Sequence, residues 1–177
     1  MKHLRLFESF ISEAKYNPVR ELEPGEPYTY DLTCYHATVL DFWPSIQRYG
    51  LIPGKENHPG QTWKTKYGGK AIYYHLSFPI HELLNSYDEQ TGQPYNMVIE
   101  ARFKMPGTYI LPDEEISLDP AFTPKAIKNK DAIALFYGIP SRCFTHIHMI
   151  DTDLSRSWAK DNINKRFNVK FHPVDSE

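Results

Sequence analysis

The stretch Tyr35-His36-Ala37-Thr38 places polar side chains at the point where an apolar run ends. The residues before it have the composition of a strand, and from Val39 onward the apolar residues follow helical spacing. Because side chains alternate between the two faces of a strand, we expect His36 and Thr38 on one face at the strand end. That position can present reactive side chains. A histidine there can equally be a core residue whose ring is bonded to a backbone carbonyl.

Length and composition predict one compact domain. The 177 residues are enough for one well-packed core and too few for two ordinary domains. Hydrophobic residues at 41% and aromatic residues at 14% are globular values, which excludes a disordered chain. The net charge of -2 gives no overall attraction to nucleic acid or to a membrane surface. No apolar run approaches the roughly 20 residues that span a bilayer, so no membrane partner is expected.

Short strands with few helices between them dominate the rest of the chain. Strands are expected over residues 32–38, 71–78, 95–104, 131–137, 144–150 and 167–171, and helices over 40–49, 81–87, 124–130 and 154–160. This order predicts an α+β fold with a mostly antiparallel or mixed sheet. A Pro-rich linker over 16–30 precedes the domain, which covers 31–152, and 153–177 form a C-terminal helix and strand extension.

The first fifteen residues form an amphipathic segment. Four apolar side chains fall near one face at helical spacing: Leu4, Phe7, Phe10 and Ile11. The segment resembles the capsid-targeting peptide of internal head proteins in large tailed phages. That resemblance implies cleavage after Glu13, in Ile11-Ser12-Glu13, by a phage prohead protease, and a location in the virion head interior and then the host cytoplasm. Alternatively, the helix simply packs on the domain.

Common catalytic and metal-binding patterns are absent from the sequence. It contains no GxxxxGK[ST], GxGxxG, GxSxG or HExxH. His146 and His148, two apart on an expected strand, form a partial ligand set with Cys143, but no CxxC or third well-spaced ligand accompanies them. No metal site is therefore expected. Cys34 and Cys143 lie in apolar runs and are expected to be free thiols.

Two motifs in order carry a resemblance to a known family. Tyr35-His36-Ala37-Thr38 is similar to a Tyr-His-Gly-Ser/Thr motif, and the strand AIYYHLS at 71–77 is similar to a Gly-Ile-Tyr-Phe strand. Both belong to the ADP-ribosyltransferase fold, in the branch with a His-Tyr-Glu triad, which includes diphtheria-type toxins and poly-ADP-ribose polymerases. The resemblance covers roughly residues 31–151. It implies a split mixed or antiparallel β core with short flanking helices.

The resemblance also implies residue roles and a substrate, NAD. It assigns catalysis to His36, Tyr73 and Asp131, and NAD binding to Tyr35, Thr38, Ser77 and Tyr87. These residue types suit the reaction, because cleavage of the bond between nicotinamide and ribose develops positive charge on the sugar. Aromatic rings hold the nicotinamide flat, a histidine and a hydroxyl hold the ribose, and a carboxylate stabilises the charge.

The sequence departs from the family pattern at two positions. Asp131 stands where the family has glutamate, and Ala37 stands where it has glycine. Asp131 can be a working substitute, a residue that merely begins a strand, or the mark of a fold that no longer catalyses. The only glutamate in a nearby strand is Glu100, one strand earlier in the chain.

Two functions follow from these expectations. The first is a mono-ADP-ribosyltransferase, a glycosyltransferase that uses NAD and modifies a host protein or nucleic acid. The alternative is a catalytically inactive protein that uses the same fold for binding, or as an internal head protein. An RNA 2'-phosphotransferase is disfavoured, because that family has an arginine-rich phosphate site and here only Arg102 and Arg142 lie in the expected core.

Overall fold

The computed structural model describes residues 29–53, 71–87, 92–106, 110–113, 123–135 and 137–173. The expected helix over 1–15, the cleavage position at Glu13 and nearly all of the linker over 16–30 lie outside the described residues. In the described part of the chain, no helix is long and apolar enough to cross a membrane.

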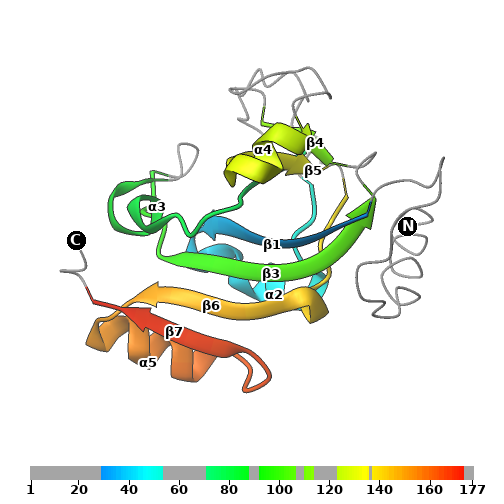
Figure 1. Cartoon of the computed structure of the whole chain (residues 1–177). Coiled ribbons are helices and arrows are strands. Elements are labelled where there is room, and N and C mark those ends of the chain that lie inside the picture. The colour runs from blue at the N-terminus through cyan, green and yellow to red at the C-terminus, as the bar shows by residue number, and fades with distance from the viewer. Residues whose placement is uncertain are drawn as a thin grey trace.

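One mixed sheet organises the described residues (Figure 1). Its seven strands are β1 (Thr29–Thr38), β2 (Ile72–His75), β3 (Met97–Pro106), β4 (Ile110–Pro112), β5 (Ala132–Leu135), β6 (Phe144–Ile150) and β7 (Asn168–His172). Their order across the sheet is β4-β5-β2-β1-β3-β6-β7. All neighbours are antiparallel except β6 and β7, which are parallel. The α+β class and the mixed sheet are thus confirmed.

The sheet is joined weakly between β1 and β2. β1 pairs with β3 along its whole length, from Thr29 opposite Pro106 to Thr38 opposite Met97. With β2 it shares a single register pair, Tyr35 opposite His75. The two strands therefore separate beside Tyr35-His36-Ala37-Thr38, and the sheet opens at the stretch that carries the first motif.

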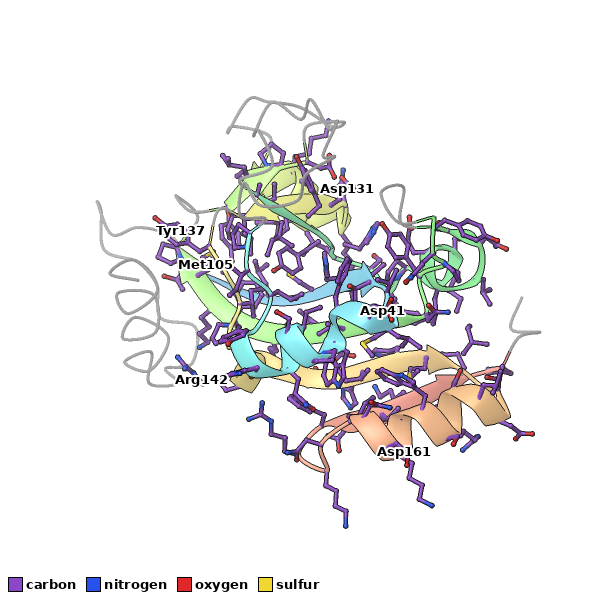
Figure 2. The ribbon with its side chains drawn as sticks, turned by 180° about the vertical axis from the view of Figure 1, so that it is seen from behind. Asp41, Met105, Asp131, Tyr137, Arg142 and Asp161 are labelled. Atoms are coloured by element: carbon purple, nitrogen blue, oxygen red, sulfur yellow. The ribbon has the colours of Figure 1, made fainter. Side chains whose placement is uncertain are left out.

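Short helices flank the sheet on both faces. They are α2 (Trp43–Tyr49) after a 3-10 turn (Leu40–Phe42), α3 (Ile80–Asn85), α4 (Thr123–Asn129), a 3-10 turn (Ser141–Cys143) and α5 (Asp153–Asn162). Figure 2, seen from behind, shows α2 and α5 on the same side of the sheet. The indole N–H of Trp43 in α2 donates to the carbonyl of Asn162 at the end of α5, at 3.1 Å, which joins the two helices.

Alternate residues of the central strands form the core, on the face that α2 and α5 cover. The largest group of them lies on β3: Met97, Ile99, Ala101, Phe103 and Met105. We call this the core face of the sheet. Cys34 and Cys143 are buried and free, as expected. Cys34 lies opposite Ala101, which lies opposite Phe144, so a whole strand separates the two thiols. That spacing of roughly 9 to 10 Å exceeds the reach of a disulfide.

Two expected elements differ from the prediction in an informative way. The strand expected over 71–78 ends at His75, because the chain then crosses the opposite face of the sheet to place Phe78 against His148. The helix expected over 40–49 begins with a 3-10 turn. It ends as predicted at Gly50, whose φ of 81° and contact with the carbonyl of Ile139 leave no room for a side chain.

Candidate active site

His36 fills the gap where β1 and β2 separate. Its Nδ1 lies 3.0 Å from the backbone oxygen of Tyr73. If β1 and β2 stayed paired beyond Tyr35 and His75, the carbonyl of Tyr73 would face the backbone of Ala37. The imidazole N–H of His36 therefore takes the place of a backbone N–H donor of β1. A carbonyl only accepts, so Nδ1 carries the proton and donates. Burial lowers the pKa of His36 and leaves the ring neutral at pH 7.

The second ring nitrogen of His36 is therefore an acceptor. It makes no hydrogen bond with any residue that the structure describes. The ring lies beside that of Tyr74, with centroids 5.6 Å apart. One nitrogen of His36 thus satisfies a backbone carbonyl, and the other has no hydrogen-bond partner among the described residues.

Replacement of His36 separates these roles. His36→Ala should lower the free energy of unfolding by about 1–3 kcal/mol, because the Tyr73 carbonyl loses its donor in a partly buried place. His36→Asn offers an amide N–H at a position similar to that of Nδ1 and should recover most of that stability. Urea denaturation of both variants measures the difference. Equal destabilisation by Ala and Asn would show that the hydrogen bond to Tyr73 contributes little.

The end of α4 positions the backbone of Asp131. Lys130 has a positive φ of 58°, and its N–H donates to the carbonyl of Ile127 at 3.2 Å. The N–H of Asp131 donates to the carbonyl of Ala126 at 2.9 Å. These two bonds form a Schellman motif, which ends the helix and turns the chain into β5.

The end of β2 holds the same backbone from the other side. The N–H of Leu76 donates to the carbonyl of Asp131 at 3.1 Å, and the hydroxyl of Ser77 donates to the carbonyl of Lys130 at 3.2 Å. The carboxylate of Asp131 has no hydrogen bond or ion pair with any residue that the structure describes. Hydrogen bonds from both sides therefore fix the backbone of Asp131, whereas its partly buried carboxylate has no partner among the described residues.

Strand register places Asp131 and His36 on the same face. His36 follows Tyr35 and so lies beside Tyr74, which is opposite Ile133. Asp131 precedes Ile133 by two residues, so it continues the same face of β5. Two strand spacings across and two residues along separate the α-carbons of His36 and Asp131 by roughly 12 Å. Figure 2 shows Asp131 at the α4 end of β5.

The other tyrosine of β2 takes the place expected of Tyr73. Only the backbone carbonyl of Tyr73 meets His36, because its side chain projects from the opposite face, with those of Tyr35 and His75. Tyr74 shares the face of His36, is 1% exposed, and its hydroxyl has no hydrogen-bond partner among the described residues. Sequence reasoning missed Tyr74, although the alternation that puts Tyr73 on one face puts Tyr74 on the other.

The expected NAD-binding residues are distributed over the sheet. Thr38 is buried on the face of His36, and Ser77 is exposed beside Asp131. Tyr87 is 61% exposed after α3, where it bridges to Pro94. Tyr35 lies on the opposite face, edge-on to the rings of Phe78 and His148. The structure therefore places Ser77 and Asp131 together beyond the end of β2, His36 beside the middle of β2 and Thr38 level with its start, and it leaves the side chain of Tyr35 on the opposite face.

Glu100 does not face His36. It lies opposite Tyr35, whereas its neighbour Ile99 lies opposite His36. Its carboxylate accepts from the hydroxyl of Thr145 at 2.6 Å and contacts His146 Nδ1 and His148 Nε2, each at 3.0 Å. These hydrogen bonds outweigh burial and lower the pKa of Glu100 to about 2. Of the two acids weighed from the sequence, only Asp131 shares the face of His36.

The histidines considered as metal ligands are part of this arrangement. His146 and His148 share a face, as their spacing predicts, but both rings bind Glu100, and Cys143 is buried at the end of the 3-10 turn before β6. Within the described ranges, no three His, Cys, Asp or Glu side chains are arranged to hold a metal ion.

Comparison of the chain with protein-family models, with curated proteins and with solved structures found no match.

Proposed function

We propose that this chain is an NAD-dependent mono-ADP-ribosyltransferase that modifies a host protein or nucleic acid. The observation that carries the proposal is the adjacency of β5, β2 and β1. His36 and Tyr73, 37 residues apart, belong to the two segments that resemble family motifs, and Asp131 follows Tyr73 by 58 residues; all three lie on or directly before these neighbouring strands. His36 and Asp131 face the same side there, with Tyr74 between them.

The chemistry of the two side chains fits cleavage of NAD. The bond between ribose C1' and nicotinamide breaks, nicotinamide leaves as a neutral molecule, and an acceptor nucleophile bonds to C1' and loses its proton. The carboxylate of Asp131 stabilises the positive charge that develops on the ribose. The free nitrogen of His36 accepts a hydrogen bond from a ribose hydroxyl and so holds the sugar still.

In this proposal, three further residues of the resemblance supply the remaining contacts. Tyr87, exposed after α3, offers a ring on which nicotinamide can stack. Ser77 donates its hydroxyl proton to Lys130, and its oxygen remains an acceptor for an amide N–H. Thr38, on the face of His36, is the remaining hydroxyl of the first motif.

The resemblance of residues 1–15 to a capsid-targeting peptide supports the proposal that the protein acts inside the host of a phage. A peptide of this kind delivers an internal head protein into the phage capsid, from which it enters the host cytoplasm with the DNA. Residues 1–15 lie outside the described part of the chain, so this part of the proposal rests on the sequence motif.

Turnover of NAD by the purified protein tests the proposal. Released nicotinamide is measured by chromatography, and host lysate is examined by mass spectrometry for added ADP-ribose. We expect turnover by the wild type and a loss of about 100-fold in His36→Asn, which keeps the bond to Tyr73 but lacks the ring acceptor. His81→Gln, an exposed histidine on α3, is the matched control and should retain activity.

A second function is favoured by the aspartate at position 131. Aspartate is one methylene shorter than glutamate, so its carboxylate reaches less far toward a substrate. This is expected of a fold that has kept a binding role and lost catalysis. In that case neither nicotinamide release nor ADP-ribose transfer occurs, and His36→Asn leaves the phenotype of infected cells unchanged. NAD turnover by the wild type would exclude it.

A further inference from the structure

The face opposite His36 carries a chain of hydrogen-bonded ionisable groups that the proposed reaction does not use. Glu100 on β3 contacts His148 Nε2 on β6 at 3.0 Å, and His148 Nδ1 lies 2.9 Å from His172 Nε2 on β7. We call Glu100, His148 and His172 the relay. His148 is 4% exposed and is one of two buried polar residues in the described part of the chain, the other being Thr38.

The geometry permits only some protonation states. The carboxylate of Glu100 accepts, so His148 Nε2 carries a proton and donates. His148 Nδ1 and His172 Nε2 are close enough to share one proton but cannot both carry one. Burial lowers the pKa of His148 to about 4, against the opposing effect of Glu100. Burial and Lys170 lower the pKa of His172. At neutral pH both rings are therefore uncharged, and His172 donates to His148.

Phe78 ties this relay to the segment after β2. Its ring stacks on that of His172 with centroids 4.7 Å apart and planes 25° apart, and it lies 4.7 Å from the ring of His148. Tyr35 contacts it edge-on at 5.6 Å. Phe78 lies in the connection between β2 and α3, and its ring packs on the imidazoles of His148 on β6 and His172 on β7. It therefore holds this connection against the far strands of the sheet.

The surrounding charges come from every neighbouring element. They are Tyr35 on β1, Glu100 on β3, His146 on β6, Lys170 on β7 and the ion pair of Asp151 with Arg156 beside the end of β7. The helix α3, which packs on β6, carries His81 and Glu82, and His81 is exposed. Lys170 Nζ lies 3.9 Å from Glu100 and opposes a further positive charge on the relay. Of the acids named here, Glu100 is the one hydrogen-bonded to His148, and its oxygens are already bonded to Thr145, His146 and His148.

We propose that the relay and Phe78 form an acid-sensitive latch that holds the connection between β2 and α3 at neutral pH and releases it when both imidazoles are protonated. Two charged rings cannot share a hydrogen bond, and an exposed imidazolium is better hydrated than one beneath Phe78. Release frees the chain beside Ser77, whose hydroxyl bonds to the carbonyl before Asp131. The latch does not depend on NAD chemistry, and only its consequence for Asp131 rests on the proposed function.

Nuclear magnetic resonance of the full chain tests the latch without NAD. Imidazole nitrogen signals report protonation of His148 and His172, and the ring signals of Phe78 report stacking. In the wild type, we expect the Phe78 signals to change together with protonation of the two rings, below pH 6.5. His172→Gln keeps an N–H donor for His148 without a titrating ring, so its Phe78 transition should move down by about one pH unit, a tenfold change in proton affinity.

Two further variants make the result decisive. His81→Gln should leave the Phe78 transition where it is in the wild type. Phe78→Leu removes the stacked ring, and since burial holds the pKa of His172 down, His172 should then titrate at higher pH. The proposal is overturned if the Phe78 signals of the wild type stay constant while both imidazoles titrate. It is also overturned if His172→Gln leaves the Phe78 transition at its wild-type pH, or if Phe78→Leu leaves the titration of His172 unchanged.

Discussion

Asp131→Asn should reduce NAD turnover by about 100- to 1000-fold while leaving the fold intact. The amide is almost the same size, so the Schellman motif and the bond from Leu76, which use only the backbone of Asp131, are retained. What is lost is the negative charge that stabilises the developing positive charge on the ribose, and charge stabilisation of this kind contributes on that scale. Nicotinamide release at saturating NAD measures the loss.

Two comparisons identify the cause of that loss. Asp131→Glu restores the residue that the family motif contains and should keep turnover within about tenfold of the wild type, because the charge is retained and the carboxylate only moves outward. Asp161→Asn is the matched control, an exposed aspartate on α5, which Figure 2 shows far from Asp131. If Asp131→Asn retains wild-type turnover, Asp131 only begins a strand and the catalytic proposal fails at that residue.

Stability should fall steeply as the pH drops from 6.5 toward 4. The pKa of His148 is about 4 in the folded chain and 6.5 ordinarily, because its ring is buried. Between these values the unfolded chain binds a proton that the folded chain does not, so stability rises with pH and is lost on acidification. His148 is 5% exposed at its side chain, and its full contribution is at most about 3 kcal/mol.

Glu100 extends the same trend to lower pH. Its pKa is about 2 when folded and 4.5 ordinarily, so its stabilising contribution is present above pH 4.5 and is lost as the pH falls toward 2. Urea denaturation at a series of pH values measures both effects. His148→Gln should be less stable at pH 7, yet its stability should change less between pH 6.5 and 4. His81→Gln should follow the wild type, and a His148→Gln curve parallel to the wild type would disprove the assignment.

Local sequence predicted most of the elements. The alternation of apolar residues over β3 and β6, the glycine that ends α2 and the spacing of α5 all depend on neighbours along the chain, so the sequence alone located them. The sequence also placed His36 near the end of one strand and Asp131 at the beginning of another, and these positions agree with β1 and β5. The end of β2 was predicted too long, because the chain leaves the strand after His75 to place Phe78 against His148.

The pairing of strands decided what the sequence left open. Alternation within one strand predicts that His36 and Thr38 share a face, but it does not tell whether Tyr73 or Tyr74 joins them. The register pair of Tyr35 with His75 settles that in favour of Tyr74. The choice between Glu100 and Asp131 was open for the same reason, since which acid faces His36 depends on strands brought together only by folding.

The sequence by itself determined the class of fold, the order of most of its elements and the position of His36 at the end of a strand. Only the tertiary structure decided that Tyr35, Glu100 and the paired histidines belong to the other face, where Glu100, His148 and His172 form a relay beneath Phe78. The physical reason is that periodicity is a property of neighbouring residues, whereas a hydrogen bond between β3, β6 and β7 exists only once those strands are in register.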